Sequence, residues 1–264
     1  MTVEGMQVRT ASEPSTSTTR RPIIAIDGPA GAGKSTVARH LARYFGLLNL
    51  ETGAMYRAFA LKALDAGLNL EDQAALLALS TQTSITLEPT STGNRVLLDG
   101  ADVTTLLRNP RVSDAASRVS VHPPIRAWMV ALQQALGASG GIVMEGRDIG
   151  TVVFPHADVK IFLDAAPEVR GLRRFDQTAL NDTSTQNDKT ALADTTQPEE
   201  IVRELRARDE RDRNRADSPL KAAADAVLLN STHLTLDEVV ARAEAIVIQK
   251  LGPEIGIPLQ SQSR

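Results

Sequence analysis

The sequence contains no cysteine among its 264 residues. This absence excludes disulfide bonds, thiolate metal sites and thiol nucleophiles. No apolar run approaches the roughly 18 residues that a membrane-spanning helix needs, and residues 1–20 are rich in Ser and Thr without an apolar signal-peptide core. We therefore expect a cytoplasmic protein with no membrane partner.

Aromatic residues and surplus charge are also scarce. Phe, Trp and Tyr make up 3% of the chain, and the formal net charge is −3. Nucleic-acid binding usually draws on a basic surplus, and single-strand binding on aromatic stacking platforms. We expect no nucleic-acid partner, so any anion must be bound by local clusters of arginine. The apolar fraction of 42% is ordinary for a globular protein, and the length fits one large domain with insertions.

The most informative stretch follows the apolar run at 23–26. Gly28 to Ser35 fits the pattern G-x-x-x-x-G-K-[ST], in which backbone N–H groups surround phosphate oxygens. Glycines leave room for that approach, Lys34 supplies a mobile positive charge, and Ser35 supplies a hydroxyl for Mg²⁺. An amphipathic helical pattern follows and ends at Gly46, so the positive end of its dipole points at the loop. The stretch predicts a polyphosphate site.

Periodicity along the chain predicts alternating strands and helices, and therefore an α/β fold with a parallel sheet. Polar residues collect where two strands end, at 145–148 and at 164, which is the edge where such sheets place their sites. Thr52 is the predicted cap of the helix at 54–66. The predicted strands are 23–26, 47–50, 141–144, 159–163 and 227–229, and the main helices are 54–66, 110–120, 125–136, 199–214 and 236–251.

Two regions depart from this alternation. Short strand-like runs at 84–87 and 95–98 predict a hairpin, and with it an inserted subdomain over about 83–120. The helix that begins at Pro167 is expected to end before a stretch at 178–198 that is rich in Thr, Asp, Asn and Gln, so we predict a mobile lid over about 170–200. One domain is expected over 21–251, between a disordered leader at 1–20 and a frayed tail at 252–264.

The helix at 199–214 is rich in arginine. Its inward face begins with Ile201 and Leu205 and then turns charged, which predicts a polar cavity because an unpaired charge in an apolar core is very costly. The alternative is a solvated helix with intrahelical ion pairs, such as Asp209 with Arg213. The phosphate loop favours the cavity, since arginine clamps phosphate oxygens with two parallel hydrogen bonds. The charged residues of this face are Arg208, Asp212 and Arg215.

Four segments together resemble the bacterial cytidylate kinases: 28–36, 52–57, 146–155 and 208–215. The resemblance extends from about residue 22 to residue 250. It implies a three-layer P-loop α/β kinase with a parallel central sheet, a nucleoside-monophosphate-binding insertion and a lid. It also implies transfer of the γ-phosphoryl group of ATP to CMP or dCMP, with Mg²⁺, giving CDP or dCDP and ADP. We expect a monomer.

The resemblance implies a role for individual positions. Lys34, Arg147 and Arg215 would be catalytic. Ser35 would hold Mg²⁺ directly and Glu145 would hold it through water. The residues implied for ATP are Gly28, Pro29, Ala30, Gly31, Ala32, Gly33, Lys34, Ser35 and Thr36, with Arg173 and Arg174 as candidates for the γ-phosphate. Those implied for the acceptor are Thr52, Arg57, Ser117, Arg126, Arg147, Asp148, Arg208, Asp212 and Arg215.

Within the acceptor set, Ser117, Arg126 and Asp148 would recognise the cytosine. A carboxylate accepts from the exocyclic amine of cytosine, whereas uracil presents a carbonyl oxygen at that position and would be repelled. The alternative for Asp148 is an ion pair with a neighbouring arginine. The chain departs from the family pattern at Glu51-Thr52, where Asp-Ser is usual, at Glu145, where Asp is usual, and in its longer, more polar lid.

Other functions remain open from the residues alone. One is a P-loop kinase for another acceptor, such as UMP and CMP together or shikimate. Another is a GTPase-like switch, which is disfavoured because the sequence has no Asn-Lys-x-Asp string and because its arginine clusters indicate a second anionic ligand. A third, an ATP-dependent binding module, is disfavoured by the lack of a basic surplus.

Overall fold

The computed structural model describes residues 21–90, 93–182, 198–253 and 255. Outside these ranges lie the predicted leader, the central part of the predicted lid and most of the predicted tail. In the described part of the chain, no helix is long and apolar enough to cross a membrane.

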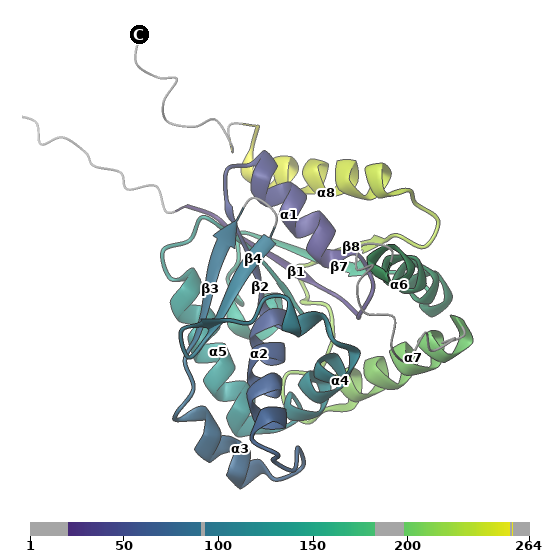
Figure 1. Ribbon diagram of the computed structural model, residues 1–264. Coiled ribbons are helices and arrows are strands. Elements are labelled where there is room, and N and C mark those ends of the chain that lie inside the picture. The colour runs from purple at the N-terminus through teal and green to yellow at the C-terminus, as the bar shows by residue number, and fades with distance from the viewer. Residues whose placement is uncertain (1–20, 91–92, 183–197, 254, 256–264) are drawn as a thin grey trace, which may run out of the picture.

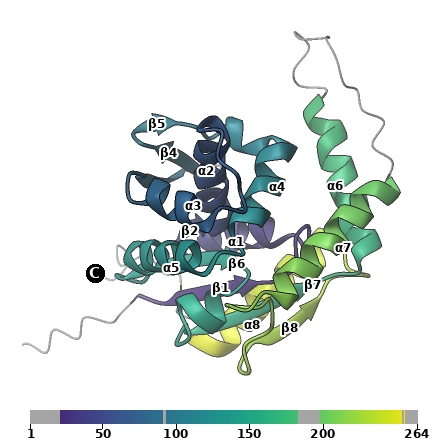
Figure 2. The same ribbon diagram turned by 90° about the horizontal axis from the view of Figure 1, so that it is seen from below.

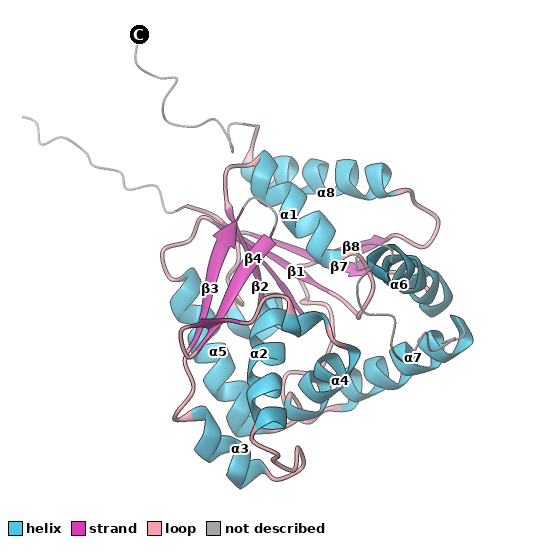
Figure 3. Ribbon diagram, viewed as in Figure 1, coloured by secondary structure: helices cyan, strands magenta, loops and turns pink. Residues whose placement is uncertain are grey.

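A five-stranded parallel sheet forms the centre of the molecule (Figures 1 and 3). Its strands are apolar runs bounded by polar or glycine residues, as the sequence predicts for strands that are covered on both faces. The spatial order is β2-β6-β1-β7-β8. The strands are β1 (Ile23–Asp27), β2 (Leu48–Glu51), β6 (Ile142–Gly146), β7 (Val159–Asp164) and β8 (Val227–Asn230).

Alternation along β1 sends side chains to two different cores. Ile24 and Ile26 pack with α1 (Lys34–Tyr44) and α8 (Leu236–Leu251) on one face. Ile23 and Ala25 pack on the other face, against a larger core that includes α2 (Thr52–Asp65) and α5 (Pro123–Gly137). Helices therefore cover both faces of the sheet, which confirms the predicted three-layer α/β fold (Figure 1).

A second, antiparallel sheet lies within the predicted insertion. It consists of β3 (Ile85–Thr90), β4 (Gly93–Leu98) and β5 (Ala101–Asp102). β3 and β4 form the predicted hairpin. Asn94 joins it to the edge strand β2: its side-chain amide donates to the Asn49 carbonyl at 2.7 Å and accepts from the Glu51 N–H at 2.9 Å. The other elements of this region are α3 (Gln73–Ser80), the 3₁₀ turn η1 (Leu106–Arg108) and α4 (Pro110–Val119).

Two predictions about helix ends are wrong. α6 (Pro167–Asp182) continues past residue 178, because the sequence between Gly171 and Pro198 contains no glycine or proline that would end it. α2 begins at Thr52, so this residue lies in the first turn and does not cap the helix. α6 packs beside α7 (Pro198–Asn214) at one end of the sheet (Figure 2).

Candidate active site

The phosphate loop leaves the carboxyl end of β1 in a conformation that requires glycine. At Gly28, φ is 149°, and a Cβ atom there would lie 1.9 Å from the Leu163 carbonyl oxygen. Gly33, with φ of 96°, directly precedes α1. The N-terminus of α1 therefore faces the loop, and its free N–H groups and dipole favour an anion there.

Lys34 begins α1 and is 5% exposed. Its ammonium donates to the Pro29 carbonyl at 2.8 Å and lies 4.0 Å from a carboxylate oxygen of Glu145. Burial and the positive charge of Arg147 lower the pKa of Lys34. Desolvation and repulsion both disfavour the charged form of Lys34. A polyphosphate in the loop would offset both effects, because its negative charge favours the ammonium.

Glu145 joins the loop to the end of β6. One carboxylate oxygen accepts from the Ser35 hydroxyl at 2.8 Å, and its backbone carbonyl accepts from the Thr52 hydroxyl at 2.8 Å. A hydroxyl beside one carboxylate suits Mg²⁺, which takes few protein oxygens and completes its shell with phosphates and water. The described residues contain no cluster of three or more Asp, Glu or His side chains that would hold a metal by itself. Ser35 and Glu145 thus fit a Mg²⁺ ion that arrives with a nucleotide.

A cleft of about 600 Å³ opens from the loop across the carboxyl ends of β2 and β6. The part of the loop that lines it is Ala30, Gly31, Gly33, Lys34, Ser35 and Thr36. The predicted acceptor residues that line it are Thr52, Arg57, Arg126, Arg147, Asp148, Arg208, Asp212 and Arg215. Residues that are distant in sequence therefore meet in one cavity, as the resemblance implies.

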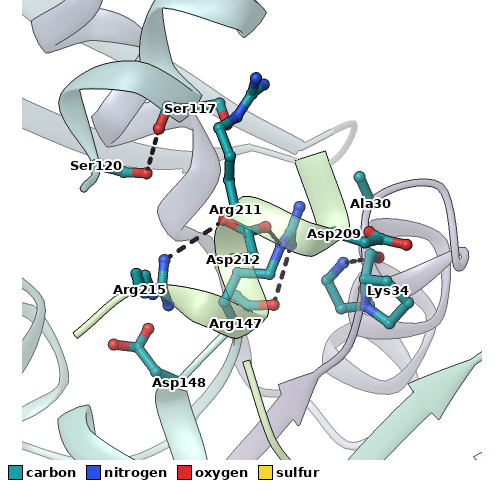
Figure 4. A network of polar contacts seen from close by, with 12 residues as sticks. Ala30, Lys34, Ser117, Ser120, Arg147, Asp148, Asp209, Arg211, Asp212 and Arg215 are labelled. Atoms are coloured by element: carbon teal, nitrogen blue, oxygen red, sulfur yellow. Dashed lines mark hydrogen bonds and ion pairs between the residues drawn. The ribbon is translucent and has the colours of Figure 1, made fainter. Parts of the chain in front are cut away.

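The centre of the cleft is a network around Asp212 (Figure 4). Arg147 donates from Nε to one carboxylate oxygen at 3.0 Å, and Arg215 Nη1 lies 3.6 Å from the other. Burial alone would raise the pKa of Asp212, but Arg147 and Arg208 hold it below its ordinary value. Asp212 thus stays ionised and orients the two arginines.

Three arginines of the cleft have a buried N–H group with no hydrogen-bond partner in the described part of the chain. These atoms are Nε of Arg126, Nε of Arg208 and Nη2 of Arg215. Burial and neighbouring Arg147 lower the pKa of Arg208 to about 10. Leaving a buried charged donor unpaired costs about 1–3 kcal/mol or more, so these groups indicate an anionic ligand in the cleft.

At one end of the cleft, Arg126 and Asp148 form a buried ion pair. Arg126 also donates to the Ser120 carbonyl at 3.2 Å, and its guanidinium carbon lies 5.8 Å from the centroid of the Tyr56 ring. Burial raises the pKa of Tyr56 to about 12, so its phenol stays neutral. The ion pair predicted as the alternative for Asp148 is therefore present, and it fixes a carboxylate at the wall of the cleft.

Ser117 lies apart from its two predicted companions. Its hydroxyl accepts from Nε of Arg211 at 3.3 Å, and it lines an adjoining cavity between α4 and α7 that shares Arg174 and Arg208 with the cleft. Ser120, one turn further along, donates to the Ser117 carbonyl at 2.9 Å (Figure 4) and lines the cleft. That Ser117 reads the base therefore stays a prediction, with Ser120 as a second candidate at this wall.

On α6, Arg174 lines the cleft, whereas Arg173 donates to Ser231 at 2.8 Å and 3.1 Å. Arg57, at another wall, is held by Glu51 at 2.5 Å. Glu51 lines the cleft itself and also orients Arg57.

Sequence reasoning missed a buried ion pair behind the loop. Arg170 of α6 is 1% exposed and donates to Asp209 of α7 at 2.6 Å and to the Ala30 carbonyl at 2.9 Å. The alternative pairing of Asp209 with Arg213 is therefore wrong, because Asp209 points into the protein. No role was assigned from the sequence to four other residues that line the cleft: Arg39, Tyr56, Arg108 and Ser120.

Comparison with known proteins agrees with this geometry. The family model described as "Cytidylate kinase" matches residues 24–249. The chain belongs to the cytidylate kinase family. The resemblance drawn from the sequence is thereby confirmed.

Individual relatives match over most of their length. The cytidylate kinase of Pelotomaculum thermopropionicum is 48% identical over 83% of this chain and 92% of its own. That of Geobacillus thermodenitrificans is 44% identical over 88% of this chain and 99% of its own. Among solved structures, a shikimate kinase from Acinetobacter baumannii in complex with shikimate is 16% identical, with a TM-score of 0.40 over 89% of this chain and 96% of its own.

Proposed function

We propose that this chain transfers the γ-phosphoryl group of ATP to CMP or dCMP, giving ADP and CDP or dCDP. One observation carries the proposal beyond family membership: the phosphate loop and arginines with unpaired buried N–H groups line the same cleft. A loop alone accounts for one polyphosphate. The arginines require a second anion beside it, which is what a kinase with a phosphate acceptor needs.

The donor side neutralises the negative charge of the ATP phosphates. The residues from Gly28 to Thr36 surround the phosphates, and Lys34 exchanges its bond to the Pro29 carbonyl for the group that is transferred. Ser35, and Glu145 through water, would hold Mg²⁺, which would supply further neutralisation of phosphate charge. Arg174, which lines the cleft, is our candidate for the γ-phosphate, and Arg173 is not, since it bonds Ser231.

The acceptor side orients a phosphate that is already ionised at neutral pH. Its oxygen is the nucleophile, so no strong general base is needed. Arg57, Arg147 and Arg215 hold this phosphate, while Arg208 and Asp212 contact the ribose. Catalysis then consists of alignment and of charge neutralisation as the γ-phosphoryl group moves to the acceptor oxygen.

Asp148 selects the base. Arg126 fixes its carboxylate at the wall of the cleft, where it can accept from the exocyclic amine of cytosine. The carbonyl oxygen of uracil would face this carboxylate and leave both acceptors without a donor. The neighbouring Tyr56 ring closes the same end of the cleft.

This reaction also suggests roles for the insertion and the lid, an oligomeric state and a location. The insertion at about 83–120 contributes Arg108, Ala116 and Ser120 to the cleft. The lid predicted at about 170–200, of which residues 183–197 lie outside the described structure, would exclude water and so suppress ATP hydrolysis. A monomer suffices for this reaction, because one chain supplies every residue named for the cleft. It works in the cytoplasm, in pyrimidine nucleotide metabolism.

A panel of nucleoside monophosphates tests the proposal. With ATP and Mg²⁺ in a coupled ADP-release assay, CMP and dCMP should be turned over far better than UMP, AMP or GMP. Phosphoryl transfer is checked by detecting CDP as product. If UMP is turned over as fast as CMP, the role of Asp148 is wrong. If no monophosphate stimulates ADP release, the acceptor site is wrong.

A further inference from the structure

Asp27 is the last residue of β1 and directly precedes the phosphate loop. It is 4% exposed and does not line the cleft. Both of its carboxylate oxygens are used: Oδ1 accepts from the N–H of Ile149 and Oδ2 from the N–H of Gly150, each at 2.7 Å. The residue that precedes the phosphate loop is thereby hydrogen-bonded to the segment that follows β6.

That segment is η2 (Ile149–Val153), a single π-helical turn. Its later N–H groups, those of Val152 and Val153, bond to the Asp148 carbonyl, but its first two have no acceptor within the turn. Asp27 supplies both acceptors. The turn begins directly after Arg147 and Asp148, so the carboxylate fixes the backbone from which these two side chains reach into the cleft.

The sheet itself does not provide this connection. β1 and β6 are paired up to Asp27 opposite Gly146, where the ladder ends and the two chains separate. One continues into the loop that binds ATP, and the other continues into the residues proposed to hold CMP. The two bonds of Asp27 lie immediately beyond the last pair of the ladder, where the relative position of the two nucleotides is set.

We propose that Asp27 is a positioning residue for the acceptor nucleotide, which holds Arg147 and Asp148 in register with the phosphate loop. This inference rests on the proposed function, because it assumes that these two residues bind CMP. Asp27 touches neither nucleotide. Its loss should therefore misplace the acceptor more than the donor, and a misplacement of about 1 Å can cost on the order of a hundredfold in rate.

The space around the carboxylate is closed. A Cβ atom added to Gly150 would lie 3.3 Å from Asp27 Oδ2 and 3.1 Å from Cδ of Lys160. Gly150→Ala therefore pushes on the same contact from the opposite side while leaving the carboxylate in place. It supplies a second variant that perturbs the connection without replacing the charge.

Asp158 provides a matched control. It accepts from the N–H of Ile23 at 2.7 Å, so it makes the same kind of bond to β1, but at the end of the strand far from the cleft. Asp158→Asn makes the same change from carboxylate to amide at a residue that is bonded to the same strand. Its effect should be confined to stability.

The experiment compares steady-state kinetics of the wild type, Asp27→Asn, Gly150→Ala and Asp158→Asn, with CMP and ATP varied in turn. We expect Asp27→Asn to raise KM for CMP by about tenfold to a hundredfold and to lower kcat, with KM for ATP changed by less than about threefold. Gly150→Ala should shift KM for CMP in the same direction by a smaller factor. Asp158→Asn should leave both KM values unchanged.

Several results would overturn the inference. One is a folded Asp27→Asn enzyme with the wild-type KM for CMP, and another is an equal rise in both KM values, which would assign Asp27 to the phosphate loop alone. If Asp27→Asn does not fold, an unchanged KM for CMP in Gly150→Ala overturns it. A wild type that does not phosphorylate CMP refutes the proposed function and this inference with it, whereas an active wild type with unaffected variants refutes this inference alone.

Discussion

The two sides of the cleft are built in different ways. The donor side is one continuous segment, Gly28 to Thr36, which offers backbone N–H groups and a single buried ammonium. The acceptor side draws its arginines from α2, α5, the turn after β6 and the region of α7. On that side, carboxylates hold arginines in advance: Glu51 holds Arg57, and Asp212 holds Arg147.

This difference separates two tasks. Backbone N–H groups at a helix N-terminus bind any polyphosphate, so the donor side carries little information about the substrate. Arginines that are oriented by carboxylates have a fixed direction, and they lose less conformational freedom when a ligand binds. Under the proposed function, the acceptor side would therefore determine which molecule is phosphorylated, and the donor side would supply the phosphoryl group.

Among the variants that test this comparison, Lys34→Met should have the largest effect, a loss of kcat. The buried ammonium neutralises charge in the transition state, so its loss should lower kcat about a thousandfold. CMP binding, measured by calorimetry, should change by less than about threefold, because this side chain belongs to the donor side. A comparable loss of CMP affinity would mean that the two sides are not separate.

Replacing Arg215 with alanine should have an intermediate effect. Arg215 is 9% exposed and has a buried Nη2 group without a partner in the described structure. We expect KM for CMP to rise about tenfold to a hundredfold, with KM for ATP nearly unchanged. The matched control is Arg203→Ala on α7, whose side chain is 75% exposed and pairs with Glu200; it should behave as the wild type. A rise in KM for ATP instead would assign Arg215 to the donor.

The smallest expected effect is one on stability, and it concerns Asp27, at the junction of the two sides. Burial raises its pKa from 3.8 to about 6, and the N–H groups of Gly150 and Ile149 partly offset this. Of the nearby charges, Asp148 raises the pKa and Lys34 lowers it. A pKa raised on folding gives stability that is complete below the unfolded value and is lost as pH rises through the folded value.

The measurement for Asp27 is urea unfolding of the wild type and Asp27→Asn at several pH values. From pH 5 to pH 6 the wild type should lose about 1 kcal/mol of unfolding free energy relative to the variant. Other titrating groups are common to both proteins and cancel in the difference. A difference that is independent of pH, or one with the opposite slope, would contradict the raised pKa.

The fold and the donor side could be predicted from sequence because their signals are local. The phosphate loop is contiguous, and the strands around it are short apolar runs with clear ends. The residues of the acceptor side were named through resemblance to a family, and the structure brings all of them but Ser117 to the cleft. Ala116 and Ser120, four residues apart on one face at the end of α4, line the cleft, whereas Ser117 is about 100° further round the helix.

What could not be predicted depends on tertiary contacts. Asp209 follows Arg208 in a charged helix, and nothing local distinguishes a solvated carboxylate from one that is buried against Arg170 of another helix. Asp27 carried a weak signal, since it stands at the end of a buried strand. Its partners, two backbone N–H groups more than 120 positions away, have no sequence signature at all.

The most direct test of the central claim, that the acceptor side selects the substrate, is the ratio of kcat/KM for CMP to that for UMP in the wild type and in Asp148→Asn. An asparagine amide can turn to donate to the carbonyl of uracil, so the variant should discriminate less. One such base contact is worth about 1–3 kcal/mol of discrimination, so the account predicts a large ratio in the wild type and a fall of at least about tenfold in the variant. A ratio that is the same in both proteins would contradict it.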